Sequence, residues 1–214
     1  MDSSFIRRSL LNREHPVRIG IIGAGAMGKG ILYQTLVTPG VECVVLCDIN
    51  KKMLDDCVSS LSLNAEMAGT ASSLGSIVDS GKTALCTDGL LAACYDGIDV
   101  LVEASSSITA GARFVLSAID NKKHVVLMNA EIDLLFGPLF LLRAREKGVI
   151  VSSCDGDQHG VIKQLIDDIK LWGFEPIMAG NIKGFLDRSS NPGDILPPLE
   201  EVGASRSSSL LAAA

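Results

Sequence analysis

The stretch Val17-Arg-Ile-Gly-Ile-Ile-Gly-Ala-Gly-Ala-Met-Gly28 determines the fold class of this 214-residue chain. Its glycines have the spacing G-x-G-x-x-G and follow a short apolar run that is typical of a buried β-strand. A helix-like segment follows the glycines, and Asp48 closes a second apolar run at Cys43-Val-Val-Leu-Cys-Asp48. Strand, glycine turn, helix and correctly spaced acid together predict a dinucleotide-binding unit.

The glycine motif predicts a backbone site for a pyrophosphate. Gly23 is expected to make the tight turn, Gly25 to let the phosphates approach the backbone, and Gly28 to allow close packing of helix on strand. Free N–H groups and the positive end of the helix dipole favour an anion there. The expected cofactor contacts are Gly23, Ala24, Gly25, Ala26, Met27 and Gly28. A glycine-rich turn without a ligand is the alternative.

Asp48 is the candidate contact for a ribose. A carboxylate at this position accepts hydrogen bonds from ribose hydroxyls and repels a 2′-phosphate, so it favours NAD over NADP. Lys51 and Lys52 follow closely and could attract that phosphate, although solvated positions in the next helix are their ordinary role. NAD is the expected cofactor, with NADP as the alternative.

The pattern along the chain predicts an α/β fold, a Rossmann-like doubly wound parallel sheet with helices on both faces. Strands are expected near 17–22, 42–48, 83–86, 99–103, 124–128 and 149–152, with helices between them. One of these helices is expected at 137–147, and an amphipathic helix is expected at 161–172. A further strand could lie at 176–181. We expect an N-terminal extension at 1–16, the nucleotide-binding domain at 17–188, and a weakly ordered tail rich in Ser and Ala at 189–214.

The composition and net charge of the chain limit the classes of partner that we expect. Hydrophobic residues make up 47% of the chain and aromatic residues only 4%, which is ordinary for an α/β domain. The formal net charge of −6 argues against nucleic acid as a partner, because no basic footprint is present. A small-molecule substrate is expected, and a homo-oligomer is possible.

Six cysteines, at 43, 47, 57, 86, 94 and 154, form no C-x-x-C pair, so no metal site is expected. Most lie among apolar residues, where a thiol behaves as a small hydrophobe. This usage fits a reducing compartment. Because the first sixteen residues lack a secretory pattern and no run has membrane-spanning length, we expect a cytoplasmic protein without membrane contact.

Ligands bind beyond the carboxyl ends of the strands in open α/β sheets, which directs attention to the residues that follow each strand. Ala104 and Ser105 are small and could admit the nicotinamide ribose, and Asn129 is placed at the same end of the cofactor. For Ser105 to Ser107, helix capping alone is the alternative.

The chain resembles the homoserine dehydrogenase superfamily, and within it the relatives whose longer members carry a SAF domain. The motifs that carry the resemblance are Ile21–Gly28, Val102-Glu-Ala104, His124-Val-Val-Leu-Met-Asn-Ala-Glu131, Asp155-Gly-Asp-Gln-His-Gly160 and Gly180-Asn-Ile-Lys-Gly-Phe-Leu-Asp-Arg188. The resemblance implies nicotinamide-dependent hydride transfer on a small alcohol or carbonyl metabolite.

Two departures from the family pattern bear on catalysis. Homoserine dehydrogenases place a lysine directly after the Asn that corresponds to Asn129, whereas this chain has Ala130, which argues against homoserine as the substrate. The family's substrate region follows the motif that ends here at Asp187, and only 27 residues remain. We therefore expect catalysis to need a partner subunit or to be absent.

Four polar side chains are candidates for a role in the reaction: Glu131, Asp157, His159 and Lys183. Glu131 could act as acid, base or substrate anchor, or could simply favour the start of a helix through the dipole. His159 could move a proton near neutral pH, with a loop residue as the alternative. Lys183 could polarise a carbonyl, with a surface lysine as the alternative. Cys154, which is close to His159 in the sequence, offers a different enzyme hypothesis, in which a thiolate attacks an aldehyde.

Two functions follow from the sequence. The first is an NAD(P)-dependent oxidoreductase of the homoserine dehydrogenase-like family. The second is a truncated domain that binds NAD(H) without turnover and acts in regulation or interaction.

Overall fold

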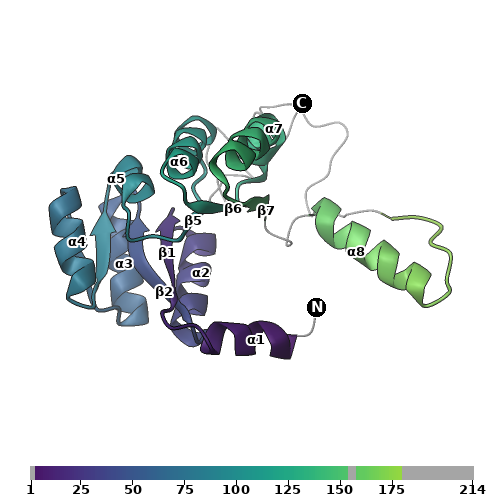
Figure 1. Ribbon diagram of the computed structural model, residues 1–214, viewed down its shortest axis with the longest axis horizontal. Helices are drawn as coiled ribbons and strands as arrows, with labels where there is room; N and C mark the ends of the chain where they lie inside the picture. Colours follow the sequence, from purple (N-terminus) through teal and green to yellow (C-terminus); the bar gives the residue numbers. More distant parts are fainter. Residues whose placement is uncertain (1–2, 154–157, 180–214) are drawn as a thin grey trace, which may run out of the picture. The chain divides into compact units, whose positions relative to one another are not determined.

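The computed structural model describes residues 3–153 and 158–179 and shows an α/β architecture. The chain divides into two units, Met1–Ser153 and Cys154–Ala214. The first unit holds the whole sheet with its helices, and the second holds α8 (Gln158–Leu171) (Figure 1). Among the described residues, no helix combines the length and apolar character needed to cross a membrane.

Seven parallel strands form one sheet in the order β3-β4-β2-β1-β5-β6-β7. Their bounds are β1 Val17–Ile22, β2 Val41–Cys47, β3 Ala65–Met67, β4 Thr83–Cys86, β5 Val100–Glu103, β6 His124–Leu127 and β7 Val151–Ser153. The six strands expected from the sequence have the usual dinucleotide-fold order, counted from β4 to β7 as 3-2-1-4-5-6. The predicted fold class is therefore confirmed.

Helices cover both faces of the sheet (Figure 1). On one face, α2 (Ala26–Val37) and α3 (Lys51–Leu61) pack Leu32, Leu54 and Cys57 against Ile21 and Leu46 of the central strands. The other face carries α4 (Ala71–Asp79), α5 (Gly89–Cys94), α6 (Ile108–Asp120) and α7 (Ala130–Lys147), whose buried residues form a second cluster with the sheet. Strands β2, β4 and β5 are largely buried between these two layers, as their continuous apolar runs predict, whereas the edge strands β3 and β7 are not.

Several elements differ from the sequence prediction. The segment before β4 contains the short edge strand β3 and helix α4, whose boundaries the Ser- and Gly-rich sequence did not indicate. Residues 3–11 of the N-terminal extension form helix α1 (Ser3–Leu11). The described part of the segment expected as a further strand, residues 176–179, contains no strand.

Helix α7 begins seven residues earlier than the sequence indicated, at Ala130 rather than at Gly137. Pro138 lies inside this helix. Proline has no N–H for the carbonyl four residues earlier, which belongs to Leu134. Leu134 is 82% exposed, so water can satisfy that carbonyl and the helix continues.

Candidate functional site

A cavity of about 550 Å³ lies at the carboxyl ends of the central strands. It is formed where the chain leaves β1, β2, β4 and β5, at the position where strand order reverses about β1. Ligands of open α/β sheets bind at this kind of switch point. The cavity is lined by Ile22, Gly23, Gly25, Cys47, Asp48, Ile49, Thr87, Asp88, Gly89, Ala104, Ser105, Ser106, Ser107, Ala110 and Phe114.

The glycine turn after β1 has the geometry that its sequence predicts. Gly23 has a φ of 103°, and a Cβ there would lie 2.4 Å from the Ala104 carbonyl oxygen, so only glycine fits. A Cβ on Gly28 would lie 1.7 Å from the Gly23 carbonyl oxygen. Helix α2 therefore packs directly on the turn, and both glycines are required by the fold itself.

Gly25 differs from the other two glycines. It is the N-cap residue of α2, with a φ of −67°, and a Cβ there would meet no atom within 4 Å. The room that this glycine leaves open belongs to the cavity. In the described part of the chain, the N–H groups of Ala26, Met27 and Gly28 donate no hydrogen bond, as expected for a first helical turn. These donors and the helix dipole suit an anion.

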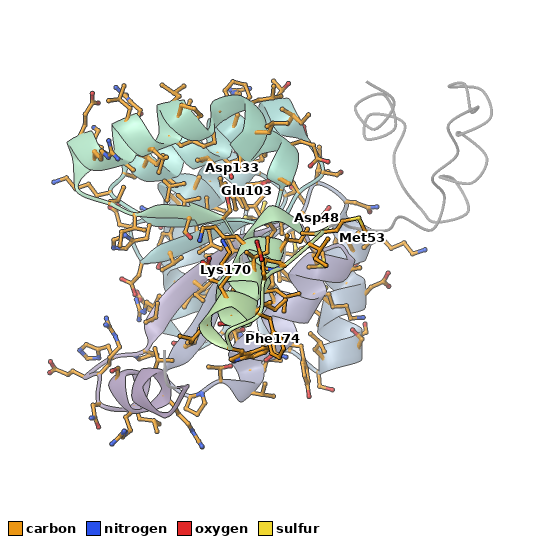
Figure 2. The ribbon with its side chains drawn as sticks, turned by 90° about the vertical axis from the view of Figure 1, so that its right-hand side faces the viewer. Asp48, Met53, Glu103, Asp133, Lys170 and Phe174 are labelled. Atoms are coloured by element: carbon orange, nitrogen blue, oxygen red, sulfur yellow. The ribbon has the colours of Figure 1, made fainter. Side chains whose placement is uncertain are left out.

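Asp48 directly follows β2 and lines the cavity (Figure 2). Its Oδ2 accepts the Ala24 N–H at 2.7 Å, and its Oδ1 accepts the Asn50 N–H at 2.8 Å. The carboxylate thus ties the glycine turn to the start of α3, where the Asn50 side chain caps the helix. Each carboxylate oxygen keeps a second lone pair, so Asp48 can still accept a ribose hydroxyl.

The turn after β5 forms the opposite wall of the cavity through Ala104 and Ser105. Glu103 holds Ser105 in place, because its Oε1 accepts the Ser105 N–H at 3.1 Å and also the Ser105 hydroxyl. Ser107 caps α6 by accepting the Ala110 N–H. Helix capping and cavity lining therefore occur together in this turn.

Asn129 does not line the cavity but supports its wall. Its Nδ2 donates to the Ser105 carbonyl at 2.8 Å, and its Oδ1 accepts the Ile132 N–H as the N-cap of α7. The side chain is buried, with 6% of the residue exposed. Both polar ends of the amide are thus engaged within the protein.

Of the candidates for catalysis, the structure places only Glu131 relative to this cavity. Glu131 lies exposed in the first turn of α7 and is not a lining residue. His159 belongs to the first turn of α8, in the second unit, so its loop alternative does not hold. Asp157, Lys183 and Cys154 lie outside the described residues.

Sequence reasoning missed the β4 side of the cavity. Thr87, Asp88 and Gly89 line it, and Asp88 also caps α5 by accepting the Leu90 N–H at 2.9 Å. The signal was present, because these residues directly follow a strand of the parallel sheet, where ligand contacts occur. Ile49, next to Asp48, is 91% exposed and adds an apolar side chain at the same edge.

Four cysteines of the first unit are buried free thiols. Cys43, Cys47, Cys57 and Cys86 are free and buried, and burial raises the pKa of Cys43 to about 12. A thiol with such a pKa is protonated and inert at neutral pH. Within the described residues, no group of three or more His, Cys, Asp or Glu could hold a metal ion.

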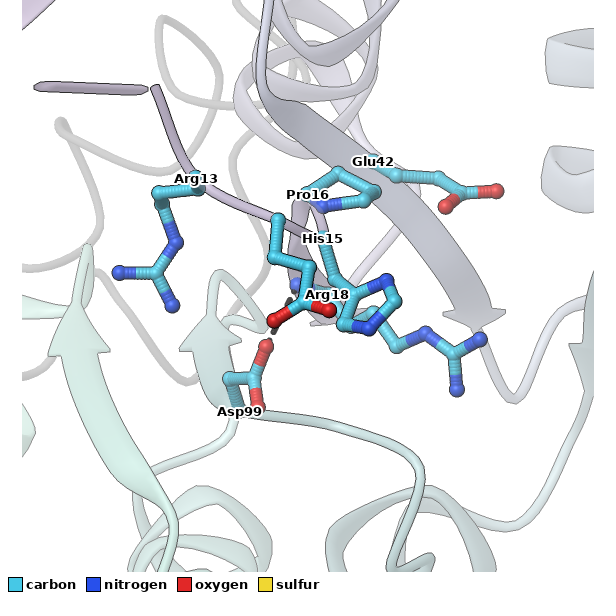
Figure 3. A pocket seen from close by; sticks show the side chains of 7 residues that line it. Arg13, His15, Pro16, Arg18, Glu42 and Asp99 are labelled. Carbon is cyan, nitrogen blue, oxygen red and sulfur yellow. Dashed lines mark hydrogen bonds between the residues drawn. The ribbon is translucent and has the colours of Figure 1, made fainter. Parts of the chain in front are cut away.

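A second hollow, of about 780 Å³, lies at the amino ends of β1, β2 and β5 (Figure 3). It is lined by Arg13, Glu14, His15, Pro16, Arg18, Glu42 and Asp99, and the Asp99 carboxylate accepts the Arg18 N–H at 2.8 Å. Its lining mixes basic and acidic side chains, so it has no clear preference for an anion or a cation. It also lies at the opposite end of the strands from where this fold binds ligands.

Comparison with known proteins gives relatives by sequence. No family model matches the chain. The homoserine dehydrogenase of Pseudomonas aeruginosa is 30% identical over 138 residues, which is 64% of this chain and 28% of that protein. The homoserine dehydrogenase of Bacillus subtilis is 26% identical over 137 residues, covering 62% of this chain and 28% of that protein. The chain thus spans less than a third of the length of these curated relatives.

Solved structures share the fold. A homoserine dehydrogenase from Thiobacillus denitrificans superposes with a TM-score of 0.54 at 20% identity, over 73% of this chain and 34% of that one. Myo-inositol dehydrogenase from Lactobacillus casei, in complex with NAD(H) and myo-inositol, gives a TM-score of 0.53 at 21% identity, over 73% and 42%. The WlbA dehydrogenase from Bordetella pertussis, in complex with NADH and UDP-GlcNAcA, gives 0.54 at 17% identity, over 74% and 44%. The chain is thus related in sequence to homoserine dehydrogenases over 64% of its length, and it has the Rossmann-like fold of the solved dehydrogenases.

Proposed function

We propose that this chain binds NAD(H) in the carboxyl-end cavity and is the coenzyme-binding part of an NAD-dependent oxidoreductase. The observation that carries the proposal is the cavity itself, where the open side of Gly25 and the carboxylate of Asp48 line one space. The sequence similarity to homoserine dehydrogenases supports it, as do the dehydrogenases of the same fold that were solved with NAD(H) or NADH.

The geometry suggests how the coenzyme would lie. The pyrophosphate would rest on the free N–H groups of Ala26, Met27 and Gly28, next to Gly25. The adenosine ribose would contact Asp48, with the adenine along Ile49 and the turn at Thr87. The nicotinamide end would then reach the Ala104–Ser105 wall.

NAD rather than NADP is the proposed coenzyme. The Asp48 carboxylate would repel a 2′-phosphate at the ribose. Lys51 and Lys52 are exposed at the start of α3. They could attract a 2′-phosphate, but that phosphate would also lie close to the Asp48 carboxylate, which repels it. Affinity for NADPH is therefore expected to be the weaker of the two.

The proposed reaction is hydride transfer between the nicotinamide and a small alcohol or carbonyl metabolite. Glu131, His159 and Lys183 remain the candidates for proton transfer and substrate anchoring. Ala130 stands where homoserine dehydrogenases have lysine, so the proposal does not name homoserine as the substrate. A homo-oligomer in the cytoplasm is the proposed state, with the partner subunit helping to enclose the substrate.

A second candidate is a domain that binds NAD(H) without turnover and acts in regulation or interaction. One observation favours it: among the described residues that line the cavity, none is a histidine, lysine or arginine. A hydride-transfer site usually holds such a group close to the reacting carbonyl.

Calorimetric titration with NADH and NADPH tests the binding proposal. Tighter binding of NADH is expected, and Asp48→Ala should weaken NADH binding by about tenfold while narrowing the preference over NADPH. A screen of hydroxy acids, aldehydes and sugar derivatives for NADH formation or consumption then separates the two candidates. Binding without turnover supports the second, and no binding of either coenzyme refutes both.

A further inference from the structure

Glu103 is a buried carboxyl group at the last position of β5, labelled in Figure 2. The residue is 0% exposed. Across the sheet it pairs with Ile22 and Leu127, both apolar. A Cβ on Gly111 of α6 would lie 2.9 Å from Glu103 Oε1, so this glycine makes room for the carboxyl group.

The carboxyl group is only half satisfied. Oε1 accepts both the N–H and the hydroxyl of Ser105, whereas Oε2 has no hydrogen-bond partner in the described part of the chain. Leaving a buried polar atom unpaired costs about 1–3 kcal/mol, and an apolar side chain there would avoid that cost. Such an atom is rare in a folded protein, and a role in function is one of its recognised explanations.

Ser105 connects this carboxyl group to the cavity. It lines the cavity, and a Cβ on Gly23 would lie 2.8 Å from its backbone nitrogen. The Ser105 carbonyl accepts the Asn129 amide from the start of α7. Ser105 thus forms the wall where the nicotinamide is expected, and the potential negative charge of Glu103 lies directly behind it.

We propose that Glu103 is a positioning residue whose ionised carboxylate, acting through Ser105, favours the positively charged oxidised nicotinamide over the neutral reduced one. This inference rests on the proposed function, because it requires a nicotinamide coenzyme in the cavity. It goes further in assigning the preference between the two redox forms to one buried group.

The surroundings of Glu103 make its charge responsive to the coenzyme. Burial raises the pKa of the carboxyl group to about 7, while the hydrogen bonds from Ser105 lower it. The groups that face it from α6 and α7 are Gly111 and the apolar side chain of Ile132. The charged residues nearest along these helices are Arg113, Glu131 and Asp133, and none of them contributes to the shifted pKa.

Linkage then gives the direction of the effect. A cation that stabilises the ionised carboxylate lowers its pKa, and ionisation in turn strengthens binding of that cation by the same factor. The affinity for NAD⁺ should therefore rise as the pH rises through about 7. The affinity for NADH, which lacks the ring charge, should change less.

The test is calorimetric titration of NAD⁺ and NADH into the full chain at about pH 6, 7 and 8. In the wild type, the ratio of the NADH to the NAD⁺ dissociation constant should rise about fivefold over this range. In Glu103→Gln, which cannot ionise, the ratio should stay constant. Glu66→Gln, at an exposed position on β3, is the matched control and should behave as the wild type. The rest of the chain is identical in the three proteins, so a difference between their pH profiles reports the substituted carboxyl group.

Ser105→Ala provides a second measurement that keeps Glu103. Because the Ser105 hydroxyl stabilises the ionised carboxylate, its loss should move the midpoint of the pH dependence upward. Equal pH profiles for the wild type and Glu103→Gln would overturn the coupling while leaving the proposed function in place. If Glu103→Gln does not fold, an unmoved midpoint in Ser105→Ala overturns the coupling instead. No heat with either coenzyme in the wild type would overturn the proposed function and the coupling together.

Discussion

Gly25 is the one glycine of the motif whose role can be tested without damage to the fold. Its backbone is in an extended conformation that any residue adopts, and a Cβ there meets open space. We expect Gly25→Val to keep the wild-type melting temperature and to weaken NADH binding by about tenfold or more, because the side chain occupies the phosphate approach. Calorimetry and thermal unfolding measure the two quantities.

The matched control is Gly30→Ala, which lies exposed on α2 and also meets no atom within 4 Å. It should leave NADH binding unchanged and stabilise the helix by about 0.5–1 kcal/mol. Unchanged NADH affinity in Gly25→Val would show that no phosphate approaches the backbone here.

Glu103 also predicts a pH dependence of stability that needs no ligand. Its pKa rises from 4.5 to about 7 on folding, so the folded chain holds the proton more tightly than the unfolded chain. The free energy of unfolding should therefore fall as the pH rises from about 4.5 to 7 and be level above that. The loss between pH 5 and pH 8 should be about 2 kcal/mol, and Glu103→Gln should lack it. Urea unfolding across this range measures the effect, and parallel pH profiles of the two proteins would contradict it.

At the scale of elements, the start of α7 joins helix capping to cavity support. Asn129→Ala removes the cap of α7 and also the buried donor to the Ser105 carbonyl. We expect a loss of about 2–3 kcal/mol in the free energy of unfolding, about 1 from the cap and the rest from the unpaired carbonyl. Denaturant unfolding measures this loss.

Asn50→Ala is the comparison for this element, because Asn50 caps the exposed start of α3 and its side chain makes no second hydrogen bond within the described residues. It should cost only about 1 kcal/mol. Equal losses in the two variants would show that the contact between Asn129 and Ser105 adds nothing to stability.

For the whole molecule, the cavity predicts that the coenzyme stabilises the fold. Its lining residues come from the ends of strands, the turns that follow four strands, and helices α5 and α6, so a ligand there binds only the folded chain. NADH at a hundred times its dissociation constant should add about 2.7 kcal/mol to the free energy of unfolding, seen as a higher melting temperature. Gly25→Val should keep about half of this stabilisation or less at the same concentration, because its dissociation constant is about tenfold or more higher. An unmoved melting temperature in the wild type would contradict coenzyme binding.

Local sequence patterns predicted some elements of the fold and missed others. Val17 to Gly28 and the run ending at Asp48 predicted β1, α2 and β2 closely, because glycine spacing and apolar runs report local geometry. The edge strand β3 was missed, since its three residues gain their strand conformation from pairing with β4 rather than from their own pattern. The sequence prediction placed the start of helix α7 too late. The helix continues through Pro138 because the carbonyl group that this proline leaves unpaired belongs to an exposed residue, a property that the local sequence does not reveal.

The sequence by itself determined the class of the fold and the position of the glycine turn, because hydrophobic period and glycine spacing are local properties of the chain. Only the tertiary structure decided which side chains meet. Asp48 joins the Ala24 and Asn50 amides, Asn129 supports the cavity from outside it, and Glu103 lies buried behind Ser105. These contacts link residues from different strands and helices, and burial and pKa depend on that three-dimensional neighbourhood rather than on spacing along the chain.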